Sequence, residues 1–450
     1  MRNLIAAIDL GTSKVVCLVG EKTETGVKII AINEAPTKGI SRGEVINIQS
    51  VLDAMTPTIR NVENAIGEKI NDVFVGIAGQ AIRCQQGTDH TARTNPDELI
   101  TAAEIDQITK KMYGALCMEG EEVIHAVPQS YNIDDFMGNT EPVGMSGRNI
   151  FSNFKLFIGK KSSSQLRSNV ITRSRLNLKG VILEPLASAL AVLDEDEKEV
   201  GVALLDIGGG TSDLLIIQDN VVRHAAVIPF GGNCITEDLK QGCGVSSKVA
   251  EQLKTIHGSC MSSVAPDKSV RINGIGGRKD KDIHFKTIAE IIESRVEEIL
   301  EAAMYEIERS GYKEKINAGL VITGGTSQLA NLQPFARLVT GYETRLANPS
   351  KMYALMETPL NKPSLSTGVG LVAMGFEELE KMDKGEGKTY STTTSDSWKN
   401  ENKSPVNKVK DESKENVKEQ PKEPKKSPWG GFKGIFDSFK SDNVFTDNDA

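Results

Sequence analysis

The sequence lacks the marks of disulfide-rich, zinc-binding and membrane-spanning proteins. Its cysteines contain no C-x-x-C pair, and its five histidines show no spacing typical of metal ligands. The six cysteines are scattered along the chain: Cys17, Cys84, Cys117, Cys234, Cys243 and Cys260. No stretch approaches the ~20 consecutive apolar residues that a spanning helix needs. These absences indicate a protein of a reducing compartment that meets a membrane, if at all, only at its surface.

A surplus of positive charge is also missing. The formal net charge is -8 at pH 7 and the pI is about 5.5. A chain without a basic surface has no general means of binding a nucleic-acid backbone, so we expect no nucleic-acid partner. The P-loop motif G-x-x-x-x-G-K-[ST] does not occur either. Any phosphate binding must therefore come from local turns.

The chain divides into an apolar-rich part and a polar tail. Up to about residue 376, runs rich in Val and Ile alternate with helical segments, which predicts an α/β layered fold. From Lys381 to Ser427 the residues are mostly Lys, Glu, Asp, Ser, Thr and Asn, a composition typical of disorder. We therefore place a disordered linker at 379–426, and a short acidic tail at 442–450.

An internal repeat is the most informative pattern. Leu4–Val19 reads as strand, tight glycine turn and strand, and Val202–Ile217 repeats this pattern with two further glycines. A third glycine turn, in Leu320–Leu329, follows a strand and leads into a helical segment. Two similar halves predict a cleft between them.

The first two turns have the chemistry of phosphate sites. Glycine lets backbone N–H groups approach a phosphate closely, and small hydroxyls add further donors. The residues expected there are Gly11, Thr12, Ser13, Lys14, Gly208, Gly209, Gly210, Thr211 and Asp213. Asp9 and Asp206 each end an apolar strand, and we expect them to hold a hydrated Mg²⁺ through water. One such turn alone is more often a plain hairpin, but the repeated pattern favours a nucleotide site.

Two other glycine motifs compete with this interpretation. Gly39–Gly43 matches the hydrolase elbow G-x-S-x-G, with Ser41 as nucleophile. The elbow needs a preceding strand and a following helix, and we expect neither here. Gly274–Gly277 lies in a basic loop and is more readily explained as a hairpin end.

An apolar cluster follows the polar linker. At 100° per residue its members fall within an arc of roughly 120° on one helix face. They are Trp429, Phe432, Ile435, Phe436 and Phe439. We predict an amphipathic helix at 427–441, called here the C-terminal hook, which lies in a membrane interface. The alternative is a tail that docks on its own domain.

The turns carry a resemblance. Asp9–Lys14 and Asp206–Asp213, with Thr323–Thr326 between a strand and a helix, resemble the phosphate and adenosine loops of the actin, DnaK-type chaperone and sugar-kinase superfamily. Within it, the chain resembles the FtsA family of bacterial cell-division proteins from Asn3 to about Phe376. The segments that carry this closer resemblance are Gly39–Asn47, Val123–Asp134 and Pro142–Gly147.

The resemblance implies roles for further residues. Gly324 and Gly325 would form the adenosine loop, and Glu184 would lie near the water that attacks the γ-phosphate. Glu251 and Lys254 would contact ribose and adenine, although an ordinary i,i+3 ion pair on a helix explains them nearly as well. On a helix expected from His284 to about Arg309, Arg295 would bind the C-terminal tail of FtsZ; the alternative is an exposed, solvated charge.

The resemblance also implies an actin-like two-lobed fold around a nucleotide cleft. Its expected domains are a first lobe core (1–82 and 162–199), an inserted subdomain (83–161), a second lobe core (200–228 and 310–378) and an FtsZ-tail-binding subdomain (229–309), followed by the linker, the hook and the acidic tail.

The implied function is that of an ATP- and Mg²⁺-binding protein with at most slow ATP hydrolysis. It would polymerise on the inner face of the cell membrane at the division septum, anchor FtsZ there and contact other division proteins. The alternatives of the same fold are a pilus-assembly scaffold and a small-molecule kinase.

Overall fold

The computed structural model describes residues 4–24, 26–115, 117–274, 276, 279–349, 354–355 and 361–383. The C-terminal hook, with Trp429, Phe432, Ile435, Phe436 and Phe439, lies outside the described residues, as do the acidic tail and all of the predicted linker beyond residue 383. Within the described residues, no helix combines the length and apolar composition needed to cross a membrane.

The first half is built on a six-stranded sheet in the order β11-β6-β1-β2-β3-β19. Its strands are β1 (Leu4–Leu10), β2 (Lys14–Thr23), β3 (Gly26–Pro36), β6 (Asp72–Ile77), β11 (Asn177–Leu183) and β19 (Ala354–Leu355). Strands β1, β2 and β3 form an antiparallel meander, and β6 runs parallel to β1. The predicted strand, turn and strand at Leu4–Val19 is confirmed.

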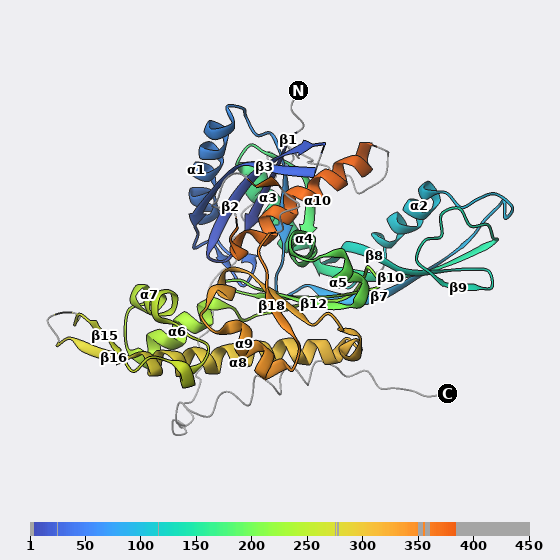
Figure 1. Cartoon of the computed structure of the whole chain (residues 1–450). Coiled ribbons are helices and arrows are strands. Elements are labelled where there is room, and N and C mark those ends of the chain that lie inside the picture. Colours follow the sequence, from blue (N-terminus) through green and yellow to red (C-terminus); the bar gives the residue numbers. More distant parts are fainter. Residues whose placement is uncertain are drawn as a thin grey trace, which may run out of the picture. The chain divides into compact units, whose positions relative to one another are not determined.

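Helices cover this sheet in two contacting pairs. They are α1 (Ile48–Ile66), α3 (Lys161–Arg173), α4 (Glu184–Val192) and α10 (Ser366–Asp383). Helix α1 packs on β2 and β3 and touches α3, whereas α10 packs on β1 and β2 and lies along α4 (Figure 1). The short hairpin of β4 (Ile40–Ser41) and β5 (Glu44–Val45) precedes α1.

The second half repeats the strand order of the first. Its sheet has the order β14-β13-β12-β17-β18, again a meander followed by strands parallel to the first meander strand. The strands are β12 (Val202–Ile207), β13 (Ser212–Gln218), β14 (Val221–Ile228), β17 (Leu320–Thr323) and β18 (Thr344–Leu346). The sequence repeat is thus a repeat of topology. The larger apolar core fills the first half and extends to Leu204, Leu215 and Val321 of the second sheet, whereas a second core lies within the second half.

The second half carries its own helices. They are α5 (Glu195–Val200), α6 (Gly232–Cys243), α7 (Ser247–His257), α8 (Phe285–Arg309) and α9 (Leu332–Thr340). Helix α8 begins within one residue of the predicted start and lies beside α9 (Figure 1). It also contacts β13 and β14, and the residues of its apolar stripe belong to the core of the second half. The hairpin of β15 (Ser269–Ile272) and β16 (Lys281–His284) leads into α8, and the Gly274–Gly277 motif lies in its connecting loop.

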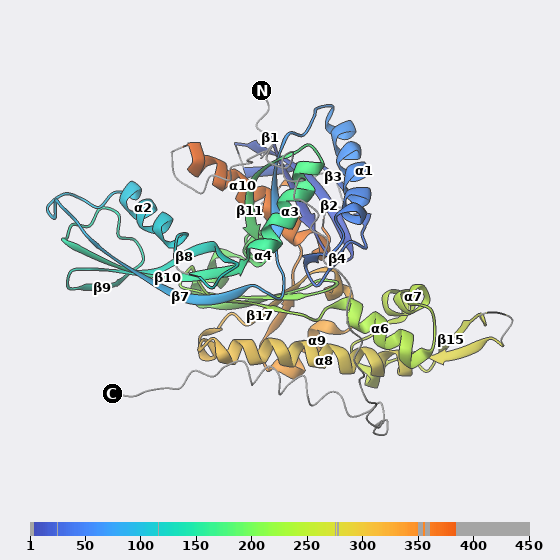
Figure 2. The same cartoon turned by 180° about the vertical axis from the view of Figure 1, so that it is seen from behind.

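An inserted subdomain leaves the first half after β6 and returns at α3. Its sheet, in the order β7-β10-β8-β9, is antiparallel and carries helix α2 on one face (Figure 2). The elements are β7 (Arg83–Ala92), α2 (Ala102–Met112), β8 (Glu121–Ile133), β9 (Phe136–Asn139) and β10 (Asn149–Lys160). It has a third apolar core of its own.

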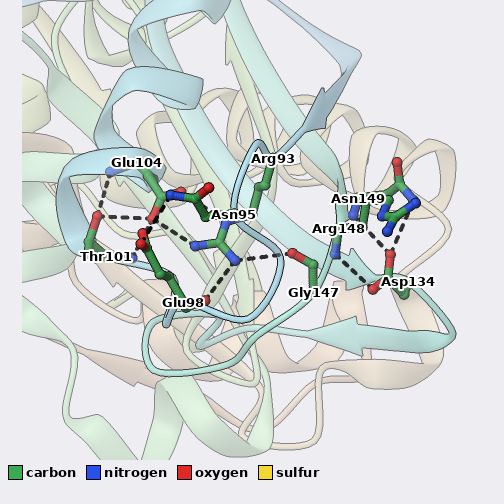
Figure 3. A network of polar contacts seen from close by, with 9 residues as sticks. All are labelled: Arg93, Asn95, Glu98, Thr101, Glu104, Asp134, Gly147, Arg148 and Asn149. Atoms are coloured by element: carbon green, nitrogen blue, oxygen red, sulfur yellow. Dashed lines mark hydrogen bonds and ion pairs between the residues drawn. The ribbon is translucent and has the colours of Figure 1, made fainter.

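A buried arginine holds the loops of the insert together (Figure 3). The Arg93 side chain, only 5% exposed, donates to the carboxylate of Glu104 and to the carbonyl oxygens of Glu98 and Gly147. Nearby, the Asp134 carboxylate accepts the backbone N–H groups of residues 148 and 149, which lowers its pKa. The segment Pro142–Gly147 is therefore fixed in place by polar contacts at its end.

The insert also touches both halves through one strand, β8. The backbone N–H of Leu183 donates to His125 Nε2 at 3.1 Å, at the end of β11. Gln129 Nε2 donates to the carbonyl oxygen of Val222, on β14, at 2.7 Å. Both residues belong to the segment Val123–Asp134 that the sequence analysis singled out.

The end of the folded region differs from the expectation. Helix α10 continues to Asp383, past the predicted boundary between 378 and the linker at 379. The composition of this stretch is polar, but Leu379 packs against the core of the first half and Glu380 pairs with Lys22. These tertiary contacts extend the helix beyond the point at which composition alone would end it.

We predict that Gly370→Ala destabilises the fold through the contact of α10 with α4. A Cβ atom at Gly370 would overlap the carbonyl group of Ala187. Relieving that overlap should lower the free energy of unfolding by about 1–3 kcal/mol. Gly114→Ala is the control, since a Cβ there meets only a carbonyl oxygen at 3.4 Å. Equal unfolding midpoints in urea for the two variants would contradict this prediction.

Candidate functional site

A cavity of about 520 Å³ is bounded by elements of both halves. Every residue that the sequence analysis assigned to the nucleotide, to magnesium or to catalysis lies on its wall. These are Asp9, Gly11, Thr12, Ser13, Lys14, Glu184, Asp206, Gly208, Gly209, Gly210, Thr211, Asp213, Glu251, Lys254, Gly324 and Gly325. Their positions are those expected, but the binding roles of these residues are still predictions.

The two phosphate turns lie against each other. A Cβ atom on Gly209 would overlap Ser13, and one on Gly210 would overlap Thr12. The absence of side chains in the second turn therefore lets the two turns meet across the cleft. The backbone N–H of Gly208 closes its own turn by donating to the carbonyl oxygen of Thr211 at 2.9 Å.

The two strand-end aspartates have different surroundings. Asp206 Oδ2 accepts hydrogen bonds from Ser188 Oγ (2.7 Å) and Thr367 Oγ1 (3.1 Å), which come from α4 and α10 of the first half. Its other oxygen lies so close to Gly324, where φ is 90°, that a Cβ there would overlap it. Two hydroxyl donors therefore orient Asp206, a carboxylate of the second half, from the first half.

Burial gives the carboxyl groups of the cavity unusual acidities. Burial and the charge of Asp206 raise the pKa of Asp9 to about 6, against an opposing effect of Lys14. The pKa of Asp206 is raised by burial, and that of Asp213 is raised well above its usual value by burial and by Asp206 and Asp9. Asp213 Oδ1 is buried without a hydrogen-bond partner in the part of the chain that the structure describes. Such a set favours an added cation.

A hydrated Mg²⁺ fits this donor set. Among the described residues, no group of three or more His, Cys, Asp and Glu side chains is placed to hold a metal ion. Mg²⁺ binds through one or two carboxylates and completes its shell with water and phosphate oxygens. Asp9 and Asp206 would supply the carboxylates.

Glu184 opens helix α4 directly below the turns. Gly76 makes room for it, since a Cβ there would lie 2.9 Å from Glu184 Oε1. Burial, followed by the charges of Asp9 and Asp213, raises the pKa of Glu184 well above its usual value, and Arg167 opposes this shift. Glu184 lines the cavity, as predicted, and in the absence of a ligand its carboxyl group is held toward the neutral form.

Lys254 lines the cavity as predicted and also makes contacts that the sequence did not reveal. Its side chain is 9% exposed, and its ammonium donates to Gly232 O (2.9 Å) and Thr236 Oγ1 (2.8 Å) while pairing with Glu251 (2.8 Å). The i,i+3 ion pair is present, but it is not a surface pair. Because these three partners engage its donors, Lys254 links α6 to α7 at the wall of the cavity. Glu251 is half exposed and able to accept from a ligand hydroxyl.

Arg295 is not the exposed, solvated charge of the alternative interpretation. Its side chain is 13% exposed and donates to both carboxylate oxygens of Asp238 (2.6 and 3.0 Å), on α6, as well as to Glu298. The hydrogen bond to Asp238 raises the pKa of Arg295. This ion pair could not be predicted from local sequence because Asp238 lies on another helix.

Some residues at the site were not foreseen from the sequence. Asn233 and Ser364 also line the cavity, and Ser188 and Thr367 orient Asp206. Gly43 lines it too, and the expected absence of elements around this motif is wrong, because β3 precedes it and the amphipathic helix α1 follows. Even so, Ser41 lies in a two-residue strand of a hairpin, not at a turn between a strand and a helix.

Solved structures similar to this one share its fold at low sequence identity. A chain of a PilM–PilN type IV pilus biogenesis complex is 13% identical with a TM-score of 0.59, covering 82% of this chain and 98% of that one. MreB5 of Spiroplasma citri bound to AMPPNP is 14% identical with a TM-score of 0.53, covering 85% of this chain and 98% of that one.

Sequence comparisons find much closer relatives. The cell division protein FtsA of Pseudomonas aeruginosa is 33% identical over 405 residues, 90% of this chain and 95% of the relative. FtsA of Neisseria meningitidis is 34% identical, covering 82% and 89%. FtsA of Escherichia coli is 31% identical, covering 84% and 91%. A model of the SHS2 domain inserted in FtsA matches residues 79–158, and a model of cell division protein FtsA matches residues 203–370.

The repeated sheets, the cavity that both halves line and the solved neighbours together define an actin-like fold. The sequence relatives identify the family within this class. The chain belongs to the FtsA family of cell division proteins. The resemblance noted in the sequence is thereby confirmed.

We predict that Asp9→Asn changes how stability depends on pH without ligand. The folded pKa of about 6 lies above the ordinary 3.8, so the wild type binds an extra proton when folded and loses stability as pH rises from about 4 to about 6. The variant should match the wild type at about pH 3 and exceed its free energy of unfolding at pH 7 by about 3 kcal/mol. Urea unfolding without magnesium or nucleotide measures this, and parallel pH profiles would exclude it.

Proposed function

We propose that the chain binds ATP with Mg²⁺ in the cavity, polymerises on the inner face of the membrane at the division septum, and anchors FtsZ there. The observation that carries the proposal is the meeting of three glycine turns and two strand-end aspartates in one cavity. Membership of a cell-division family supports the cellular role.

The residues of the cavity suit a nucleotide phosphate chain. The backbone N–H groups of the two turns and the hydroxyls of Thr12 and Thr211 would donate to phosphate oxygens. Lys14, which here contacts Glu34 (2.6 Å) and Ser364 (3.2 Å), would add a positive charge. Bound Mg²⁺ would neutralise phosphate charge, with Asp9 and Asp206 holding its water shell.

The nucleoside end of the ligand would lie against the second half. Gly324 and Gly325 leave the backbone open to it, and Glu251 would accept from ribose hydroxyls. Lys254 would act indirectly, because its hydrogen bond to the carbonyl oxygen of Gly232 holds that residue beside the second phosphate turn. ATP hydrolysis would be slow at most, and Glu184, on the cavity wall, would lie near the attacking water.

Membrane attachment would come from the C-terminal hook. Its aromatic side chains would enter the headgroup boundary while Lys433 and Lys440 stay with the lipid phosphates. One hook with three glycines should bind weakly, but hooks joined in a polymer bind at high effective concentration. Polymerisation would thus strengthen attachment.

FtsZ would bind the subdomain that contains α6 and α8. Arg295 would meet the FtsZ tail from its place beside Asp238, and the contact would require that pair to rearrange. Other division proteins would join the same polymer. The alternatives are not favoured, because the pilus-complex chain shares only the fold at 13% identity and the relatives described above are cell division proteins.

Asp213→Asn tests the nucleotide site. Without ligand, the variant should be at least as stable as the wild type at pH 7, because it removes a carboxylate whose ionised form is disfavoured by burial. With Mg-ATP at about 100 times the dissociation constant, the wild type should gain about 2.7 kcal/mol and the variant much less. Asp219→Asn, at an exposed turn, is the control. An equal gain by all three proteins in thermal unfolding would count against this site.

Vesicle co-sedimentation with FtsZ and Mg-ATP tests the tether. Trp429→Glu, Phe436→Glu should abolish vesicle binding and leave FtsZ in the supernatant, because two charges enter the apolar face. Ser438→Glu, Ser441→Glu adds the same charge on the polar side of the helix and should retain binding. If the first double variant still carries FtsZ to vesicles, the tether is wrong.

A further inference from the structure

An arginine is completely buried next to the β4–β5 hairpin. Arg167, on α3, is 0% exposed. Its Nη2 donates to the carbonyl oxygen of Gly43 and, at 2.8 Å, to that of Ala78. Its Nε and Nη1 have no hydrogen-bond partner within the described ranges, and Nη1 lies 3.9 Å from Glu44 Oε2. Because a guanidinium keeps its proton, burying it with unused donors is costly and calls for compensation.

Negative charge around the arginine supplies that compensation. Burial lowers the pKa of Arg167, whereas Glu184, Glu44 and Asp9 raise it. Two glycines leave room for the carboxylates of Glu184 and Glu44. A Cβ on Gly76 would lie 2.9 Å from Glu184 Oε1, and a Cβ on Gly79 would lie 2.5 Å from Glu44 Oε1. The buried cation thus lies between carboxylates of the site and of the β4–β5 hairpin.

A chain of contacts leads from this arginine to the first phosphate turn. The hairpin turn is held by two left-handed residues, Arg42 (φ 47°) and Gly43 (φ 75°). Gly43 accepts from Arg167 through its carbonyl oxygen, and its N–H donates to Thr12 Oγ1 at 3.2 Å. Thr12 in turn faces Gly210 of the second turn. One residue, Gly43, therefore connects the buried arginine to the hydroxyl of the first turn.

We propose that Arg167 is a positioning residue of the nucleotide site, which holds the β4–β5 hairpin so that Gly43 orders Thr12 in the first phosphate turn. This inference rests on the proposed function. Under this proposal, the segment Gly39–Asn47 connects α3 to the first phosphate turn. Arg167 touches no ligand itself, since its side chain has no exposed surface.

The test compares affinities for Mg-ATP and for AMP, measured by calorimetry on the full chain below its unfolding temperature. AMP lacks the β- and γ-phosphates of ATP, which the first turn would hold under this proposal, so Arg167→Lys should weaken Mg-ATP binding about tenfold and leave AMP binding within about twofold. Arg173→Lys, at an exposed position on the same helix, should change neither affinity. A purely structural role of Arg167 would not alter the ratio of the two affinities.

A double-mutant cycle that combines Arg167→Lys with Thr12→Val tests whether Arg167 acts through Thr12. If Arg167 acts through Thr12, the double variant should bind Mg-ATP no more weakly than the weaker single variant. Should Arg167→Lys fail to fold, Glu44→Gln replaces it, since it keeps the shape of the hairpin and removes the adjacent charge; an ATP-selective loss of about two- to fivefold is expected.

The outcomes separate the two proposals. A wild type that binds neither Mg-ATP nor AMP overturns the proposed function and this inference with it. A wild type that binds Mg-ATP, together with folded Arg167 or Glu44 variants whose ratio of Mg-ATP to AMP affinity is unchanged, overturns this inference alone. Additive losses in the cycle also overturn it, because Arg167 then acts without Thr12.

Discussion

Negative charge buried between the two halves is the constraint on which the rest of the structure depends. Asp9 and Asp206 end corresponding strands of the two repeats, and Asp206 raises the pKa of Asp9. Asp213 and Glu184 add to this charge. A fold that repeats one strand–turn–strand unit about a cleft must bring like charges together, because each copy carries its own carboxylate.

The surrounding elements reduce the cost of that arrangement in different ways. Arg167 supplies a permanent positive charge from behind, and Ser188 and Thr367 supply neutral donors to Asp206. What these groups do not compensate is left for a ligand, as the unpartnered Asp213 Oδ1 illustrates for the described residues. The site without ligand is therefore destabilising to its own fold, a compromise common at functional sites, and the proposed Mg²⁺ would relieve it.

Local patterns predicted much of this arrangement. The turns at Gly11 and Gly208 and helix α8 were predictable because glycine placement and apolar periodicity act within a few residues. Arg167, Ser188 and the partner of Arg295 were not, because their roles depend on which distant elements the fold brings together. The end of α10 was missed for the same reason, since Leu379 packs on a core that composition does not reveal.

Strand β8 limits how the molecule can move. It is hydrogen-bonded to the first half at Leu183, one residue before Glu184, and to the second half at Val222. A rotation of one half against the other changes the distance between these two points. The strand must then bend, tilt its subdomain or give up one bond. As long as both hydrogen bonds persist, the opening of the cleft and the orientation of the inserted subdomain are therefore mechanically coupled.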